Sequence, residues 1–498
     1  MNRLYRLVIA LTCVVLAAGC CRASKVYIAQ NAAGGDTGAD CANAHSVFWF
    51  DTRSNWGSLT GSIGPGTTVH LCGTISSALT IRGSGSNGRP ITILFENSAI
   101  MSAPNWGAKG SAITSKGNSY ITIDGGSNGT IQATSNGTGL ATSVDDTGVS
   151  LYHCSNCIVR NLTVANMYVH TYTPADENGL NTGGIYVADG SNVSIYNNIV
   201  HDMKWCVFYS FSLPGNSNLT IYGNTVYNCD HGIAVGSGSP NATLAGASVY
   251  GNTIHDGYLW DDNANANHHD GVHVWAVHSD AALTGLQIYG NYIYGNWGHN
   301  LNAFVFMEAN RGGMENNSLA FNNLLVDSTT LPHYGCGYLC ATADSVGIYN
   351  NTIVGSNPKS GLGISIYGTS DRVENNIVGN MLHVAWTSGS ATKSLATWDY
   401  NNYYNVGSNP WHGNSTFASW KASCGGGICH PDSHGSDSNP NLDASYHPTT
   451  QSIPIIHKGV NLSGLSNAEL TVDKSGNKRP SAPTMWTVGA YHLPAASP

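Results

Sequence analysis

The sequence predicts an all-β chain, folded as a right-handed parallel β-helix solenoid of about ten or more coils. Three observations predict it. A short motif of apolar residues around Asn or Gly recurs through the middle of the chain. The apolar segments beside these motifs are short and alternating, without a helical period. The 498 residues include 59 Gly but only 20 Lys and Arg and 29 Asp and Glu, a composition typical of stacked short strands and tight turns.

The recurring motif sets the length of one coil. Clear copies lie at residues 195–200, 221–226, 249–254, 288–293, 321–325, 348–353 and 373–378, with a weaker copy at 158–162. The second Asn of successive clear copies is separated by 26, 28, 39, 32, 28 and 25 residues, which is a solenoid period. Asn and Gly tolerate left-handed backbone angles at a bend, and stacked Asn side chains can hydrogen-bond from coil to coil. We therefore expect one coil per copy, with coils about 4.8 Å apart.

The two ends of the chain differ from its middle. Residues 1–23 have a basic start and a short apolar run, typical of a secretory signal peptide; a lipoprotein anchor at Cys20 is the alternative. We expect residues 24–80 to cap the first coil, residues 81–395 to form the catalytic β-helix, and residues 396–498 to form an irregular extension that packs on it. The protein is therefore expected to be secreted or periplasmic, without a membrane-spanning segment.

The cysteines predict disulfides. Of 13 cysteines, three lie in the predicted signal peptide, and the remaining even number fits an exported chain. Most fall in near pairs: Cys41 with Cys72, Cys154 with Cys157, Cys206 with Cys229, Cys336 with Cys340, and Cys424 with Cys429. A zinc site at the second pair is the alternative, but no second Cys-x-x-Cys accompanies it.

The charge balance limits the partners. The formal net charge is −9, and basic residues are few, which argues against binding of nucleic acid. We expect a monomer whose partner is a polysaccharide, because a solenoid offers the long groove that a polymer needs.

By pattern and residue type, these repeats resemble the pectin-lyase-like superfamily of secreted bacterial polysaccharide-active proteins. The segments GSNGRPITILF (85–95) and ITIDGG (121–126) look like entry coils of such proteins, and DYNNYY (399–404) and DKSGNKRP (473–480) look like the ending of many bacterial β-helix proteins. The resemblance implies a parallel β-helix. It leaves the reaction open, since this superfamily includes lyases, hydrolases, epimerases and phage adhesins.

One irregular step marks the expected site. The step of 39 residues between Asn252 and Asn291 holds an insertion rich in His and Asp, and Asp270 directly precedes the strand at its base. An excursion that breaks a regular scaffold and carries titratable side chains is where we expect chemistry.

Aligning the strand that follows each Asn predicts two neighbouring columns of side chains on one face. The first column holds Trp205, His231, Asp270 and Asn302. The second column holds Lys204, Asp230 and His269. Aromatic rings among polar groups suit the faces of sugars. The residues expected to bind substrate are Trp205, His231, His273, Trp260, Trp275, Asn302 and Arg311.

Hydrolysis of glycosidic bonds is the favoured hypothesis. It needs two carboxyl groups across the scissile bond, for which we propose Asp270 and Glu308, with Asp230 as a third candidate. The segment DGVHV (270–274) is similar to the strand entry of polygalacturonases. The sequence departs from that family because no double Asp follows in the next coil and no Gly-His-Gly triplet follows beyond it.

Two alternatives stay open. A lyase would abstract a proton from a uronate, with Lys204, Arg311 or His269 as the base and with Ca²⁺ at Asp261 and Asp262 to neutralise the carboxylate; no other cofactor is expected. A non-catalytic carbohydrate-binding adhesin would use the same patch only to shape a sugar site. The concentration of titratable groups in one insertion favours an enzyme.

Overall fold

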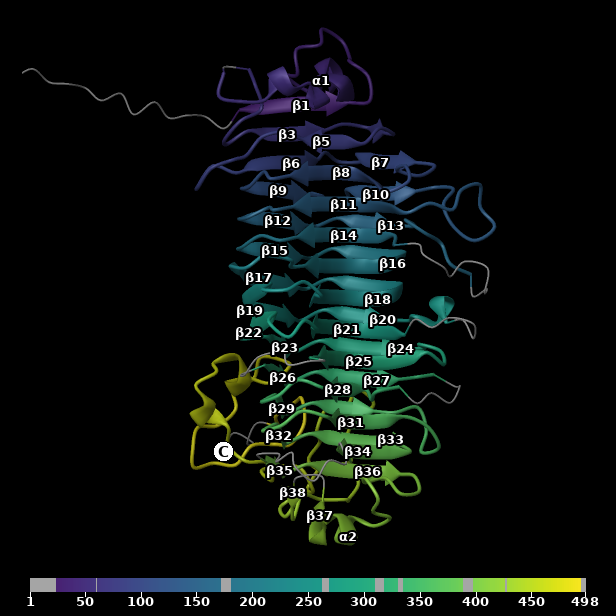
Figure 1. Ribbon diagram of the computed structural model, residues 1–498, viewed down its shortest axis with the longest axis vertical. Helices are drawn as coiled ribbons and strands as arrows, with labels where there is room; N and C mark the ends of the chain where they lie inside the picture. The colour runs from purple at the N-terminus through teal and green to yellow at the C-terminus, as the bar shows by residue number, and fades with distance from the viewer. Residues whose placement is uncertain are drawn as a thin grey trace, which may run out of the picture.

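The computed structural model describes residues 24–59, 61–171, 181–261, 268–309, 318–329, 335–387, 397–425 and 428–493. The expected signal peptide, residues 1–23, lies outside them, as do Asp262 and Arg311. The strands form a tall stack of coils, in which each strand pairs in parallel with its equivalent in the next coil (Figure 1).

Each coil supplies one strand to a first sheet and two to a second. The first sheet has 15 strands: β2 (His45–Ser46), β1 (Lys25–Ala29), β3 (Thr68–Leu71), β6 (Ile91–Phe95), β9 (Ile121–Asp124), β12 (Cys157–Arg160), β15 (Val193–Tyr196), β17 (Asn216–Tyr222), β19 (Thr243–Tyr250), β22 (Ala282–Thr284), β23 (Gln287–Tyr289), β26 (Leu319–Phe321), β29 (Gly347–Tyr349), β32 (Arg372–Glu374) and β35 (Thr397–Asp399).

The second sheet has 21 strands and folds around two sides of the coil, because β16 (Ile199–Ser210) and β18 (Thr225–Ser237) run through both sides. On one side β16 and β18 stack with β4 (Thr74–Ile75), β7 (Ile100–Ala103), β10 (Thr130–Ala133), β13 (Thr163–Ala165), β20 (Thr253–His255), β24 (Tyr292–Gly295), β27 (Leu324–Asp327), β30 (Thr352–Val354), β33 (Ile377–Met381) and β36 (Asn402–Val406). On the other, here called the third ladder, they stack with β5 (Leu79–Ile81), β8 (Gly110–Lys116), β11 (Asp146–Tyr152), β14 (Gly183–Ala188), β21 (His269–Ala276), β25 (Leu301–Glu308), β28 (Leu339–Ala341), β31 (Leu362–Ile366) and β34 (His383–Thr387).

Inward-facing aliphatic side chains fill the solenoid. In the third ladder, Val207, Ile233, Val272 and Val305 occupy the same position in successive coils, and all four are fully buried. β-Branched side chains pack well on a pleated surface, and each contributes on the order of 1.5–3 kcal/mol when it leaves water. Stacked burial of this kind fixes the register of the coils, and the predicted right-handed parallel β-helix is confirmed.

The two central residues of the Asn motif have different structural roles. The first residue takes left-handed backbone angles, as at Asn197 with φ 55° and Gly223 with φ 63°. The second forms a buried ladder through the stack: Asn252 Nδ2 donates to Ile221 O and to Asn291 Oδ1, both at 3.0 Å. The predicted coil-to-coil hydrogen bonding is therefore confirmed, and it satisfies amides that would be costly to bury alone.

All five predicted disulfides are present: Cys41 with Cys72, Cys154 with Cys157, Cys206 with Cys229, Cys336 with Cys340, and Cys424 with Cys429. The zinc alternative for the second pair is thereby excluded, because both thiols are bonded to each other.

The N-terminal region is less distinct from the coils than the sequence suggests. Short helices lie there, η1 (Cys41–Asn43), α1 (Val47–Asp51) and η2 (Arg53–Asn55), at the upper end of Figure 1. Strands β1 and β3 nevertheless pair with each other and then with β6, so stacking begins N-terminal to residue 81.

The C-terminal segment returns along the outside of the stack, where Figure 1 shows it in yellow beside the lower coils. It contains η5 (Ser463–Leu465) and η6 (Glu469–Thr471). Before it, α2 (Phe417–Ala422) and the hairpin of β37 (Cys424–Gly425) with β38 (Ile428–Cys429) lie at the lower end of the stack in Figure 1. Arg479 is buried and donates to Asn322 Oδ1 at 2.9 Å, while Trp486 packs near Phe321. In the described ranges, no helix is long and apolar enough to span a membrane.

Candidate functional site

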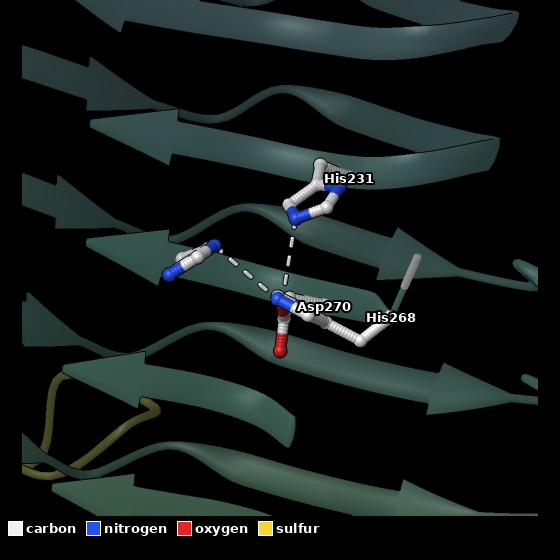
Figure 2. A group of neighbouring side chains, drawn as sticks. His231, His268 and Asp270 are labelled. Atoms are coloured by element: carbon white, nitrogen blue, oxygen red, sulfur yellow. Dashed lines mark hydrogen bonds and ion pairs between the residues drawn. The ribbon is translucent and has the colours of Figure 1, made fainter. Parts of the chain in front are cut away.

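Four side chains converge on the outer side of the third ladder. They are His231 in β18, His268 directly before β21, and Asp270 and His273 in β21, here called the histidine–aspartate cluster. One ligand-type atom from each lies within 4.8 Å of the others. In Figure 2, His231 approaches the Asp270 carboxylate from the neighbouring strand β18, and His268 approaches it from the segment directly before β21.

The distances centre on one oxygen. Asp270 Oδ2 lies 2.6 Å from His268 Nδ1, 3.4 Å from His231 Nε2 and 3.5 Å from His273 Nδ1. The other oxygen, Oδ1, accepts hydrogen bonds from Asn302 Nδ2 at 3.1 Å and from the Ala303 amide at 3.0 Å. These contacts fix the carboxylate in one orientation.

Asp270 and His273 both face the cluster, although side chains three residues apart on a regular strand point to opposite faces. Gly271 lies between them, and a Cβ at that position would collide with Phe304 O. Only glycine fits where the backbone packs this closely against the next coil. The ladder is also irregular between His269 and Asp270, where β25 carries an extra residue.

That irregularity corrects one predicted alignment. Trp205, His231 and Asp270 share a column as expected, but Asp270 pairs with Ala303 and not with Asn302. Asn302 is the additional residue of the bulge. Its amide still contacts Asp270, so the predicted neighbour is found through a hydrogen bond across the bulge.

Asp230 orients His231 of the cluster and also contacts His269. Its carboxylate accepts from His231 Nδ1 at 2.7 Å and from His269 Nδ1 at 2.8 Å, and its side chain is buried. Burial alone would raise the pKa of Asp230, but the two imidazoles hold that pKa below its usual range. In the part of the chain that the structure describes, these two histidines, and not the neighbouring Lys204, form the ion pairs of Asp230.

His269 is a structural partner rather than a surface base. Its side chain is fully buried, and Nε2 lies 3.6 Å from Asp261 Oδ1. Burial alone would lower the pKa of His269, but Asp230 and Asp261 raise it to about 9. Asp261 is itself buried and accepts from the amides of His299 and Asn300, both at 2.7 Å. A cationic histidine and two amide donors leave this carboxylate poorly suited to the Ca²⁺ role expected for it.

Charge within the cluster is uneven. Burial opposes ionisation of Asp270, but the three imidazoles lower its pKa. Burial likewise acts against charge on His268, but Asp270 raises the pKa of that histidine. His273 differs, because burial dominates and lowers its pKa. These directions favour an ion pair between His268 and Asp270 and the neutral form of His273.

Glu308 closes the cluster on one side. Its Oε2 lies 3.1 Å from His273 Nε2, and its side chain is 19% exposed, whereas that of Asp270 is 0% exposed. Among the described members of this network, His268 with 44% exposure and Glu308 therefore present surface to solvent.

Aromatic rings extend from the cluster along the same face. Trp205 stacks on His231 at 4.2 Å between ring centroids and contacts Phe208 at 5.1 Å. Phe208 contacts Tyr186 at 5.4 Å, and Tyr186 contacts Tyr152 at 5.5 Å. The rings lie on β11, β14 and β16, so they form a continuous aromatic path across successive coils.

This path borders a cavity of about 350 Å³. The lining residues are Lys109, Asp145, Thr147, Tyr152, Asn181, Gly183, Tyr186, Trp205 and Phe208. A concave site with aromatic walls and a few polar groups is typical of small-molecule and sugar binding.

Trp275 joins the aromatic path from the other side of the cluster. Its ring lies 4.6 Å from that of His273 and 5.5 Å from that of Phe208. The ring covers Gly236, where any side chain would collide with it. Trp260, in contrast, is buried in η4 (Tyr258–Trp260) and stacks on His170 at 4.6 Å, so it does not belong to this path.

Two groups of residues escaped the sequence reasoning. His268 lies in the insertion but was not assigned a role, because nothing in sequence indicates which of two adjacent histidines faces outward. Tyr152 and Tyr186 lie several coils away from the insertion. The strand alignment already places Tyr186 in register with Phe208, as the structure confirms, but Tyr186 was assigned no role.

Fold and site together define a right-handed parallel β-helix with a histidine–carboxylate cluster at one end of an aromatic cavity. The family model described as right handed beta helix region matches residues 68–269. No curated protein sequence matches the chain.

Several solved structures resemble the chain at low identity. Pectate lyase Pel9A is 13% identical, with a TM-score of 0.48, over 95% of this chain and 96% of that one. The GH136 lacto-N-biosidase from Eubacterium ramulus is 13% identical, with a TM-score of 0.44, over 84% of this chain and 67% of that one. The polygalacturonase from Erwinia carotovora ssp. carotovora is 12% identical, with a TM-score of 0.37, over 79% and 96%.

Proposed function

We propose that the chain is an exported enzyme that cleaves glycosidic bonds of a polysaccharide on the outer face of the third ladder. One observation carries the proposal: an aromatic-lined cavity adjoins a buried histidine–carboxylate cluster, because Trp205 lines the cavity and stacks on His231 of the cluster. Aromatic rings bind sugar faces, and the cluster supplies titratable groups where a bound chain would end its contact with the rings. Five disulfides support export.

Glu308 is the residue that we assign to proton transfer. It is a carboxyl group with solvent exposure, and His273 fixes its position at 3.1 Å. The buried Asp270 is a positioning residue, because its contacts are to histidines and to the next coil rather than to solvent. Hydrolysis is the first candidate reaction, and Glu308 would supply one of its two carboxyl groups, the acid that protonates the glycosidic oxygen.

β-Elimination is the second candidate, on a different observation. Lys109 lines the cavity, and Asp270 raises the pKa of His268 in the cluster, so groups that favour positive charge flank the path that a uronate polymer would follow. Elimination abstracts a proton next to a carboxylate, and neutralising that carboxylate promotes the step.

The test is incubation of the secreted protein with neutral and uronate polysaccharides, with ultraviolet absorbance and reducing ends followed together. Hydrolysis produces reducing ends without absorbance, whereas elimination produces both, because its product is unsaturated. Retained binding without cleavage of any polymer would instead make the protein a carbohydrate-binding adhesin and refute the enzyme.

A further inference from the structure

We propose that the histidine–aspartate cluster is a binding site for a divalent transition-metal ion, with Zn²⁺ the ion that its donors suit best. The site would lie at the end of the aromatic cavity, next to Glu308. The inference concerns binding of the ion and stands independently of polysaccharide cleavage.

The donor geometry carries the first step. In a tetrahedral zinc site with bonds of about 2.0–2.1 Å, neighbouring donor atoms lie about 3.3 Å apart. Asp270 Oδ2 lies 3.4 Å from His231 Nε2 and 3.5 Å from His273 Nδ1. These separations are too long for good hydrogen bonds and close to the edges of such a tetrahedron. His268 Nδ1 lies closer to Asp270 Oδ2, at 2.6 Å, because these two atoms form a hydrogen bond in the structure.

The outer hydrogen bonds of two histidines direct the inner nitrogens at the same point. Asp230 accepts from His231 Nδ1, which leaves the Nε2 lone pair of His231 facing the cluster. Glu308 accepts from His273 Nε2, which leaves the Nδ1 lone pair of His273 facing it as well. Histidine ligands of metals commonly give their other ring nitrogen to a carboxylate, which sets the tautomer.

An unpartnered atom provides a second, independent observation. Nδ1 of His273 is buried and makes no hydrogen bond in the part of the chain that the structure describes. A lone pair that faces a carboxylate oxygen at 3.5 Å is repelled by it, and burial removes the water that would relieve the repulsion. A cation between the two atoms converts this repulsion into two favourable bonds.

The chemistry of the donors selects the class of ion. Three imidazoles and one carboxylate suit zinc and neighbouring transition metals, whereas Ca²⁺ and Mg²⁺ prefer sites built from oxygen ligands.

The experiment uses the full chain, freed of metal with a chelator and then titrated with ZnCl₂ by calorimetry and with Co²⁺ by visible absorption. We expect one Zn²⁺ per chain, an intense cobalt spectrum of the tetrahedral type, and a higher thermal midpoint in the presence of zinc. Excess Ca²⁺ should not displace the ion. The variants His231→Gln and His268→Gln should each weaken binding by at least about 100-fold, and Asp230→Asn by about 10–100-fold.

His255→Gln is the matched control. His255 is half-buried and its Nδ1 lies 2.8 Å from Asp256 Oδ2, so it reproduces a His–Asp pair away from the cluster and should keep normal zinc affinity. His268 is 44% exposed, so its variant should fold even if His231→Gln does not. Absence of zinc binding, or equal binding in His268→Gln and His255→Gln, would overturn the proposal. Zinc binding without cleavage of any polymer would refute the proposed function alone.

Discussion

The Nε2 atom of His273 lies 3.1 Å from the Oε2 atom of Glu308. This contact links a buried histidine of the cluster to a carboxylate that solvent reaches. Because His273 is fixed by its strand, it fixes Glu308 in turn, and a positioned carboxyl group at the end of a sugar-binding path is what proton transfer to a glycosidic oxygen requires.

Glu308→Gln should therefore lower kcat by at least about 100-fold, because the amide cannot exchange a proton with the substrate. KM should change little, since the amide keeps the shape of the side chain. The matched control is Glu96→Gln, in which Glu96 lies 2.5 Å from His70 in another His–Glu pair remote from the third ladder. Equal activities of the two variants would remove Glu308 from the reaction.

Trp205→Ala should raise KM by about 10-fold, because it removes the ring that joins the cavity to the cluster and stacks on His231. The effect on kcat should be smaller, as the cluster itself remains. Trp386→Ala serves as the comparison: its ring stacks on His412 at 4.3 Å in the same ladder, several coils toward the C-terminus. If both variants raise KM alike, substrate does not follow the path that we assign.

The sequence was sufficient for the fold because the evidence for the fold is repeated. Each copy of the Asn motif has a residue with left-handed backbone angles followed by an Asn with a buried amide. The sequence therefore repeats the same pattern many times, often with a period of 25 to 28 residues. The disulfides followed for a similar reason, since near pairs in an exported chain have few other partners.

The site was predictable only in part because it depends on local features that occur once in the chain and are not repeated from coil to coil. The column of Trp205, His231 and Asp270 follows from strand alignment, whereas the bulge that moves Asn302 out of register depends on one extra residue. The direction of His268 and His269 was likewise not deducible: they are adjacent in sequence, yet one is exposed and the other is buried against Asp230.

Asn291→Ala should lower the free energy of unfolding by on the order of 2–3 kcal/mol. The buried amide donates to Val249 O and to Asn323 Oδ1, and its own oxygen accepts from Asn252, so truncation leaves buried partners unpaired. Chemical denaturation followed by circular dichroism measures the change. Asn128→Ala at an exposed turn should change stability by less than about 0.5 kcal/mol, and a similarly small effect at Asn291 would contradict the role of the ladder.

Asp146 is the first residue of β11 and directly follows the cavity residue Asp145 in the sequence. Its side chain is buried. Its Oδ2 accepts from the Trp106 amide at 3.0 Å. Burial raises the pKa of Asp146 from 3.8 to about 7, because few donors compensate for the water that the carboxylate loses, and Asp145 adds to the effect.

Stability should consequently fall as pH rises from about 4 to about 7, because the unfolded chain loses the Asp146 proton in this window while the folded chain keeps it. Asp146→Asn mimics the protonated form and should gain on the wild type across the same window, by on the order of 3 kcal/mol at neutral pH. Asp124→Asn is the opposite case: burial would raise the pKa of Asp124, but bonds from Asn161 and Arg160 lower it, so this variant should lose stability above pH 4. The test is to measure denaturant midpoints of the wild type and both variants across this pH range. If the midpoints of wild type and Asp146→Asn change with pH in parallel, Asp146 is ionised in the folded protein.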